Sequence, residues 1–567
     1  MVSGIWYIAQ AQSLIRLLSV ICYLYMRTCH YRKTRAERVA SSFFSFPFQG
    51  ASQPPKMKVL LVALLALAVV PAASSFEPSS PSPLLPSARF AAFPASPLLP
   101  AKRKTALPLS VLSSRSPPTS STSSSSPLRG GACSSNSAPS VNSNNARFAP
   151  PAVDRGSSSV SSSVFNLVNN VAGAGILTLP AGMARGTGVV PSLLICICLG
   201  VLSSHSFNLI GESCRLTGAR DFKTLWERSL SPSSSWIVDA VIATMCLACS
   251  VIYAGILGDV FSPFLSGLSG IPASLVGRGP CILAITASVL FPLSLLKDLS
   301  ALAFTSILGF ASVVYTVVFL VVRALDGSYA GAAARFLADK KVLPPNFSTH
   351  SMGNVDFTSL VLASNLGLAY IAHYNAPAYY RDMSDRRQFS RMVSYSFAIL
   401  TALYAVTMLA GYYTFGAACA GNVLLNYHPD DKLALLGRLA TGFSILFGFP
   451  LAFIGLSSSL LGILSKNKAV SGFVNSGVGR PLFMATLLAM VSSVAVAVPD
   501  IGAVVGITGA LMGSLIVYII PAILYARSVG LVKGWDSKEY AKAKLNNAMV
   551  PFGTLIAVMG VWMTLKG

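Results

Sequence analysis

The chain has 567 residues, of which 53% are hydrophobic and 11% are charged, and its mean hydropathy is +0.64. This composition excludes a soluble surface and predicts an integral membrane protein. The net charge is +23, with 16 Lys or Arg against 3 acids in residues 1–155 and 26 against 16 in residues 156–567. Because the positive charge is divided between a tail and scattered loops, it argues against a nucleic-acid-binding domain.

Residues 1–155 are rich in Ser, Pro and Arg, which is typical of a disordered or targeting region. An apolar stretch after Met57 ends in small residues and predicts a signal peptide over 57–75. The acid-poor segment 76–131, which starts with a Phe, then resembles a transit peptide. The pair resembles the two-part plastid presequence of algae with secondary plastids and predicts a plastid membrane. A signal anchor with a disordered tail, in an endomembrane or the plasma membrane, is the alternative, and a start at Met1 or Met57 stays open.

Residues 156–567 are predicted to form one transmembrane domain. Runs of about 20 apolar residues, long enough to cross a bilayer, recur through it. We therefore expect an all-α integral membrane fold with about eleven transmembrane helices. They cover residues 162–184, 188–213, 235–265, 280–296, 298–323, 356–380, 390–415, 433–464, 482–500, 502–527 and 548–565. The loops on one side carry 17 Lys or Arg against 9 on the other, which predicts that the N-terminus lies inside.

Two of these helices, the first and the sixth, contain interruptions. Residues 169–177 read NNVAGAGIL and residues 365–377 read NLGLAYIAHYNAP. Glycine weakens a helix, and amides within a membrane need partners. Paired interruptions of this kind predict two inverted five-helix repeats, one extra helix and a binding site at the midplane. A close helix-packing face of small residues is the alternative interpretation of the first interruption.

The same residues resemble the amino acid/auxin permease (AAAP) family, in its neutral amino acid transporter-like branch. The matching segments, in family order, are Phe165–Leu177, Ile256–Asp259, Pro292–Ser300 and Ala372–Pro377. The resemblance covers about residues 160–567. It implies a LeuT-like 5+5 inverted repeat with broken helices 1 and 6, and coupled transport of an amino acid. Enzyme motifs such as a phosphate loop do not stand out.

The resemblance also implies a substrate site at the two interruptions. Backbone groups of Gly173, Ala174 and Gly175 would meet the substrate carboxylate. Carbonyl groups near Asn365 and Gly367 would meet the substrate amino group.

Three further side chains are candidates for this site. Tyr253 is either a lid over the substrate or a packing residue of its helix. His373 and Asn375 match the family pattern of the sixth helix. They either contact the substrate or stabilise the break as a hydrogen-bonded pair.

The coupling ion stays open between Na⁺ and H⁺. The resemblance implies Asn169 and the carbonyl of Ala172 as Na⁺ ligands, together with a hydroxyl of the eighth helix. In our alignment, Thr441 and Ser444 are the only candidates for that hydroxyl, and they lie about one turn too far upstream. Intramembrane titratable groups such as Asp259 make proton coupling the alternative. These groups are His205, Glu212, Asp259 and His373.

The favoured function is secondary active transport of neutral amino acids, with an amino acid sensor, or transceptor, of the same fold as the alternative. The expected partners are the amino acid substrate and the lipid bilayer. We expect no cofactor and no metal beyond Na⁺. A disulfide between Cys281 and Cys419 stays open, because no sequence fixes their distance. The substrate's identity, the direction of transport and the oligomeric state cannot be read from the sequence.

Overall fold

The structure is a computed structural model. It describes residues 156–266, 272–295, 303–329, 335–336, 344–347, 352–464, 472–474 and 476–566. The predicted signal peptide 57–75 and transit segment 76–131 lie outside the described residues. The described part of the chain is helical, with two isolated bridges of extended backbone.

Nine helical segments of the described chain are long and apolar enough to cross a membrane. They are Val189–Thr217 (α6), Pro232–Ser266 (η3 and α8), Arg278–Leu295 (α10, η4 and α11), Ile307–Leu325 (within α12), Arg386–Phe415 (η7 and α15), Lys432–Leu464 (α16), Gly479–Ala497 (α18), Ile501–Lys533 (α19, η9 and α20) and Lys538–Lys566 (α21, η10 and α22). The shorter elements within or between them are α7 (Phe222–Ser229), α9 (Ala273–Val276), η8 (Val423–Asn426), α19 (Ile501–Thr508), η9 (Gly509–Ile519) and α20 (Ile520–Lys533).

Two more segments are broken, and they are the first and the sixth in chain order. The first comprises α4 (Val160–Val171), η2 (Ala174–Thr178) and α5 (Leu179–Ala184), with a bend of 53°. The sixth comprises α13 (Ser359–Ala369), η6 (His373–Asn375) and α14 (Ala376–Asp382). The all-α membrane fold with interrupted first and sixth helices is therefore confirmed.

The observed ends mostly agree with the predicted ones, and the main difference lies in the tenth and eleventh segments. We predicted an end near residue 527, but α20 continues to Lys533 and turns at Gly534, whose φ is +94°. Arg527 stacks over the Trp535 ring at 5.5 Å, which holds this extension in place. The short helix α7 (Phe222–Ser229) follows α6, and Asp221 caps it by accepting from the Thr224 amide at 2.8 Å.

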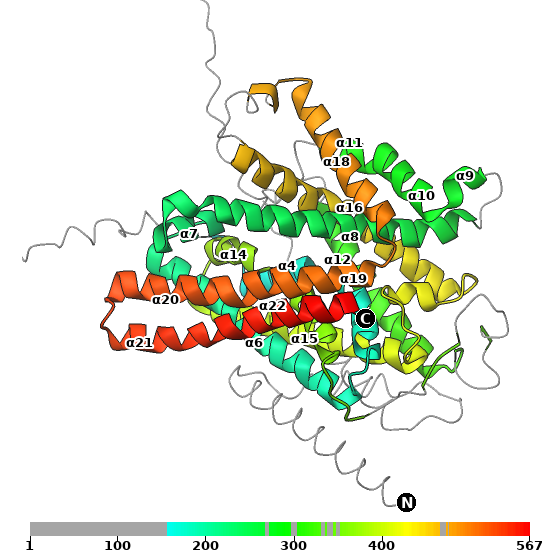
Figure 1. Cartoon of the computed structure of the whole chain (residues 1–567), viewed down its shortest axis with the longest axis horizontal. Coiled ribbons are helices and arrows are strands. Elements are labelled where there is room, and N and C mark those ends of the chain that lie inside the picture. The colour runs from blue at the N-terminus through cyan, green and yellow to red at the C-terminus, as the bar shows by residue number, and fades with distance from the viewer. Residues whose placement is uncertain are drawn as a thin grey trace, which may run out of the picture.

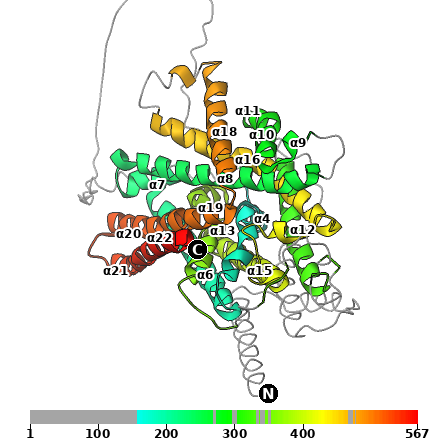
Figure 2. The ribbon, with the colours of Figure 1, turned by 45° about the vertical axis from the view of Figure 1, so that its right-hand side comes forward.

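The helices pack around α13, the first half of the sixth segment. In Figure 1, α6, α20 and α22 lie on one side of the long helix α8, and α10, α11 and α18 lie on its other side. Figure 2 shows the same division after rotation. Helix α13 has almost no exposed side chain, and it contacts α5, α19, η9 and α22. The broken sixth segment is thus at the centre of the bundle.

Glycines let the backbones of α13 and η9 touch. A Cβ atom added to Gly367 would lie 3.0 Å from the carbonyl oxygen of Gly509, and one added to Gly513 would lie 2.8 Å from the carbonyl carbon of Gly367. A Cβ atom on Gly509 would collide with the carbonyl oxygen of Ser364. Small residues permit this approach, which is a common form of helix packing in membranes.

The disulfide considered between Cys281 and Cys419 is not formed, because both cysteines are free thiols. Cys281 is buried in α10, and the Cys419 thiol donates to the Gly411 carbonyl at 3.4 Å.

The Gly367–Gly509 contact gives a stability prediction. We expect Gly509→Ala to lower the apparent melting temperature in detergent, because overpacking costs about 1–3 kcal/mol. Gly448→Ala is the matched control, since a Cβ atom on Gly448 meets nothing within 4 Å. Fluorescence-detected gel filtration after heating measures both variants. Equal melting temperatures for the two variants would contradict the close contact.

Candidate substrate and cation site

The first break lies between α4 and η2. Helix α4 ends at Val171, and Ala172 leaves the helical conformation with a ψ of +67°. Gly173 is extended, and its amide donates to the Val171 carbonyl at 2.7 Å. The first N–H groups of a helix have no acceptor within it, so those of Ala174 and Gly175 are available at the break. A helix start of this kind favours a carboxylate.

The second break lies between α13 and η6. Helix α13 ends at Ala369, and the amides of Tyr370 and Ile371 turn back to donate to the carbonyls of Leu366 and Leu368 at 2.9 and 3.1 Å. Pro377 lies in the first turn of α14, where a missing N–H costs nothing. Carbonyl groups at the end of a half-helix suit a cation or an ammonium group, and in this turn those of Leu366 and Leu368 already accept from the backbone.

The two breaks face each other. A Cβ atom added to Gly175 would lie 3.3 Å from the Cα atom of Ala369. The hydroxyl group of Tyr404, on α15, donates to the Ala369 carbonyl at 2.6 Å and lies 3.2 Å from the Val171 carbonyl. The hydroxyl of Tyr253 lies beside the first break, 3.4 Å from the place of a Cβ atom on Gly173. The structure therefore brings Gly173, Gly175 and Tyr253 together.

Tyr404 was not among the residues predicted from the sequence. It is fully buried in α15, and both of its carbonyl contacts come from distant parts of the chain. A tyrosine in a long apolar helix carries no pattern that distinguishes it from a packing residue.

Two of the predicted sixth-helix residues contact other helices instead of the first break. Gly367 packs against η9, as described above. His373 is fully buried and contacts α6 through Nε2, which lies 3.0 Å from the Ser203 carbonyl and 2.9 Å from the Ser206 hydroxyl. Because a carbonyl oxygen only accepts, the first contact places the hydrogen on Nε2. The ring of Phe207 packs edge-on against His373 at 5.3 Å.

Asn365 lies between α13 and the segment that leads into α5, and Asn375 lies at the start of α14. The Asn365 amide donates to the Thr178 carbonyl at 3.3 Å and lines a small cavity with Arg185 and Asp500. The Asn375 amide N–H donates to the Ala372 carbonyl at 2.9 Å. Asn365 thus connects α13 to the first broken segment.

Two of the candidate cation ligands, Asn169 and Ser444, lie beside a glycine of α12. A Cβ atom added to Gly309 would lie 3.0 Å from Ser444 Oγ and 3.7 Å from Asn169 Oδ1. Oxygen atoms from α4 and α16 are therefore both near the point where α12 has no side chain, and Ala172 is buried at the end of α4. Thr441 is engaged with α12, because its hydroxyl lies 3.0 Å from that of Thr316.

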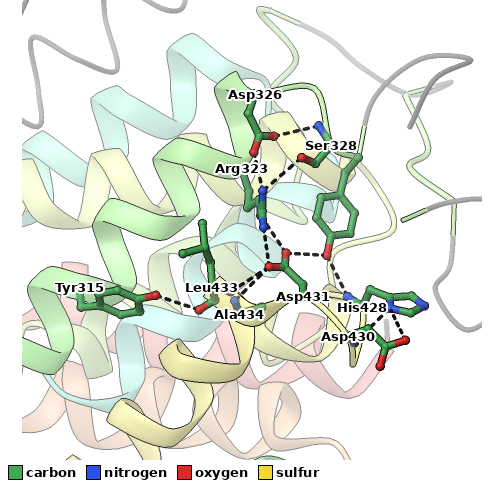
Figure 3. A network of polar contacts seen from close by, with 10 residues as sticks. Tyr315, Arg323, Asp326, Ser328, His428, Asp430, Asp431, Leu433 and Ala434 are labelled. Atoms are coloured by element: carbon green, nitrogen blue, oxygen red, sulfur yellow. Dashed lines mark hydrogen bonds and ion pairs between the residues drawn. The ribbon is translucent and has the colours of Figure 1, made fainter. Parts of the chain in front are cut away.

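A polar network at one end of α12 and α16 sets their register (Figure 3). Arg323 of α12 donates to both carboxylate oxygens of Asp431 at 2.8 and 2.6 Å, and it also contacts Asp326 at 2.6 Å. The hydroxyl of Tyr329 donates to Asp431 at 3.0 Å, and the hydroxyl of Tyr315 donates to the Leu433 carbonyl at 3.1 Å. With this register, Ser444 lies level with Gly309.

Asp259 lies away from both breaks in an ion pair. Its carboxylate accepts from Arg278 Nε at 2.7 Å, and Arg278 Nη1 also donates to the Ala495 carbonyl at 3.0 Å. This pair joins α8, α10 and α18. His205 and Glu212 also have partners, Asn546 at 2.7 Å and Arg215 at 2.7 Å.

Comparison with known proteins identifies relatives. Residues 156–566 match the family described as transmembrane amino acid transporter protein. Vacuolar amino acid transporter 2 of Saccharomyces cerevisiae is 23% identical over 395 residues, covering 67% of this chain and 79% of that protein. Solute carrier family 38 member 10 of Homo sapiens is 24% identical over 375 residues, and the match covers 64% of this chain but only 32% of that protein. The solved structure of MhsT in complex with L-phenylalanine is 16% identical, with a TM-score of 0.43, covering 72% of this chain and 100% of that one.

The network of Figure 3 predicts a pH-dependent loss of stability. Burial raises the pKa of Asp431, but hydrogen bonds from Arg323 and Tyr329 lower it by more, so its pKa lies below the usual 3.8. A carboxyl group whose pKa is lower in the folded than in the unfolded protein stabilises the fold at pH values above its unfolded-state pKa. This stabilisation is lost as the pH falls through the folded-state pKa. Arg323→Gln leaves a buried carboxylate unpaired, and we expect it to cost about 3–5 kcal/mol near pH 7.

Thermal unfolding in detergent at several pH values measures this effect. The difference in melting temperature between the wild type and Arg323→Gln should be largest near neutral pH and should narrow as pH falls toward 4. In the variant, the unpaired Asp431 carboxylate becomes protonated as pH falls, and a neutral carboxyl group is less costly to bury without a cation. Arg215→Gln is the control, since its ion pair with Glu212 is about half exposed and is expected to contribute at most about 1 kcal/mol. A difference that does not change with pH would contradict the role given to Asp431.

Proposed function

Because this chain belongs to the family of transmembrane amino acid transporter proteins, we propose that it is a secondary active transporter of neutral amino acids, coupled to Na⁺. The observation that carries this proposal is the apposition of the two breaks, where Gly175 lies against Ala369. Helices broken in mid-membrane serve to expose backbone groups to a ligand, and alternating access moves the surrounding helices about such a site. The chain is thus a multi-pass membrane protein and not an enzyme.

In the proposed binding mode, backbone groups of the protein bind the carboxylate and ammonium groups, which all amino acid substrates share. The substrate carboxylate would accept from the N–H groups of Ala174 and Gly175, and the ammonium group would donate to carbonyls at the end of α13. Tyr253, Ala369 and Tyr404, which contact the breaks, carry no charge. An uncharged surrounding favours a neutral substrate side chain, because a buried unpaired charge is costly.

The position of Asn169 and Ser444 beside Gly309 supports Na⁺ as the coupling ion. Freed carbonyl groups at a half-helix end, such as that of Ala172, are typical ligands of a small cation in transporters. The ion pair of Asp259 with Arg278 joins α8 to α10, and this structural role argues against that carboxylate as the proton carrier.

Uptake of labelled alanine by proteoliposomes that contain the full chain tests this function. We expect accumulation under an inward Na⁺ gradient and none under a proton gradient alone. Ser444→Ala should raise the Na⁺ concentration for half-maximal uptake about tenfold, equivalent to about 1.4 kcal/mol for one lost oxygen ligand. Ser458→Ala is the control on the same helix, because its hydroxyl donates to the Gly455 carbonyl at 3.2 Å and the variant should match the wild type.

The other outcomes separate the alternatives. Accumulation driven by protons would reject Na⁺ coupling and would make His373 a candidate proton carrier. Binding of alanine without accumulation under either gradient would reject transport in favour of an amino acid sensor of the same fold.

We further propose that residues 57–131 direct the chain to a plastid membrane. The support is the predicted signal peptide followed by Phe76 and an acid-poor segment. A fluorescent protein fused behind residues 1–155 should enter the plastid of an alga with a secondary plastid. Phe76→Ala should hold the fusion in the secretory route, whereas plastid entry of both fusions, or of neither, would count against the two-part presequence.

A further inference from the structure

One hydroxyl group lies between the carbonyl groups that end the two half-helices. Tyr404 Oη is 2.6 Å from the carbonyl oxygen of Ala369, the last residue of α13. It is 3.2 Å from the carbonyl oxygen of Val171, the last residue of α4. Tyr404 is fully buried on α15, which contacts both α4 and η2.

Two carbonyl oxygens that converge on one point repel each other unless a positive group lies between them. In a membrane interior such oxygens need a hydrogen-bond donor or a cation, because water does not satisfy them. The Tyr404 hydroxyl, with its single hydrogen, lies nearer the Ala369 carbonyl, at 2.6 Å, than the Val171 carbonyl, at 3.2 Å, which also accepts from the Gly173 amide at 2.7 Å. Its position therefore fixes the spacing between the end of α4 and the end of α13.

The ring of Tyr404 is held in place by a second tyrosine. The rings of Tyr370 and Tyr404 lie 4.9 Å apart, and the Tyr370 hydroxyl donates to Thr401 Oγ1 at 2.9 Å. The Tyr370 hydroxyl also lies 3.2 Å from the Cys196 carbonyl of α6. Thr401 is on the same helix face as Tyr404, since residues three apart are neighbours on a helix. The hydroxyl of Tyr404 is thus presented to the breaks by a rigid support.

We propose that Tyr404 is a positioning residue for substrate binding, which holds the two breaks at the distance that one amino acid can bridge. This inference rests on the proposed transport function. The substrate needs the N–H groups of Ala174 and Gly175 and the α13 carbonyls at the same time. Without this hydroxyl the two half-helices separate, and only a fraction of molecules has a complete site.

The inference has a kinetic signature that a purely structural role lacks. When the binding-competent form is only a fraction of the population, the apparent affinity falls by that fraction. Tyr404→Phe should therefore raise the KM for alanine about tenfold, the size expected when a buried carbonyl loses its donor. The maximal rate per folded molecule should stay within about twofold of the wild type, because saturating substrate restores the competent form.

The experiment measures alanine uptake by proteoliposomes that contain the full chain, with folded protein quantified by gel filtration. Tyr413→Phe is the matched control on α15, because the Tyr413 hydroxyl is buried and has no hydrogen-bond partner in the described part of the chain. Its KM and maximal rate should match those of the wild type. Two further variants carry non-natural residues at position 404: 4-aminophenylalanine keeps a donor, and 4-methylphenylalanine fills the same space without one. The first should stay near the wild-type KM, and the second should match Tyr404→Phe.

Three outcomes would overturn the inference. If the wild type takes up alanine and Tyr404→Phe has an unchanged KM, the inference is overturned and the proposed function is not. A lower maximal rate per folded molecule at unchanged KM overturns it as well, because a smaller binding-competent population would raise the KM instead. Equal KM values for the amino and methyl variants also overturn it, even if Tyr404→Phe fails to fold. A wild-type chain that neither accumulates nor binds alanine would instead overturn the proposed function, and this inference with it.

Discussion

The absence of water in the bilayer interior is the constraint on which the architecture depends. A helix interrupted there must find partners for the backbone groups that it frees, or leave them for a ligand. The hydroxyl of Thr178 donates to the Gly175 carbonyl at 2.9 Å, and the amide of Asn365 donates to the Thr178 carbonyl at 3.3 Å. With Tyr404 on the carbonyls of Val171 and Ala369, the side chains satisfy acceptors around the break. The N–H groups at the start of η2 are left available, so the site that remains suits an acceptor such as a carboxylate.

The second constraint is the register of α12 against α16. Three contacts at successive depths align these helices: Arg323 with Asp431, Thr316 with Thr441, and Gly309 with Ser444. Only the first is an ion pair, and its buried carboxylate lies just before α16 begins at Lys432. The deeper contacts are neutral, as the membrane interior requires. A shift of one turn, about 5.4 Å, would move the Ser444 hydroxyl away from Asn169.

The sequence was sufficient for the architecture and for part of the site. Long apolar runs defined the spans, and the glycines and amides at 169–177 and 365–377 identified the breaks, because such residues are costly in a continuous membrane helix.

The sequence did not predict which neighbouring helix each residue of the site contacts. Ser444 was expected about one turn from the ion, and only the packing of α12 against α16 shows it beside Gly309. In the same way, Gly367 was expected near the substrate amino group and His373 matches a family pattern, yet they contact η9 and α6. Tyr404 gave no signal at all, since its partners lie 35 and 233 positions away.

The contacts around the breaks group the half-helices into two pairs. In one pair, α5 and α13, the Asn365 amide donates to the carbonyl of Thr178, which directly precedes α5. In the other pair, α4 and α14, the Tyr379 hydroxyl donates to the Asn166 carbonyl at 3.2 Å. There the amide of Ser158 also donates to the Asp382 carbonyl at 3.0 Å.

Contacts within a pair resist separation, whereas the chain within each broken segment lacks continuous helical hydrogen bonds. We therefore expect bending at the breaks and little movement within a pair. Tyr404 lies where the two pairs meet, so the group that we propose as a positioning residue of the substrate site also lies between the two breaks. Substrate binding and helix movement would then depend on the same hydrogen bond, which is the physical requirement for coupling the two.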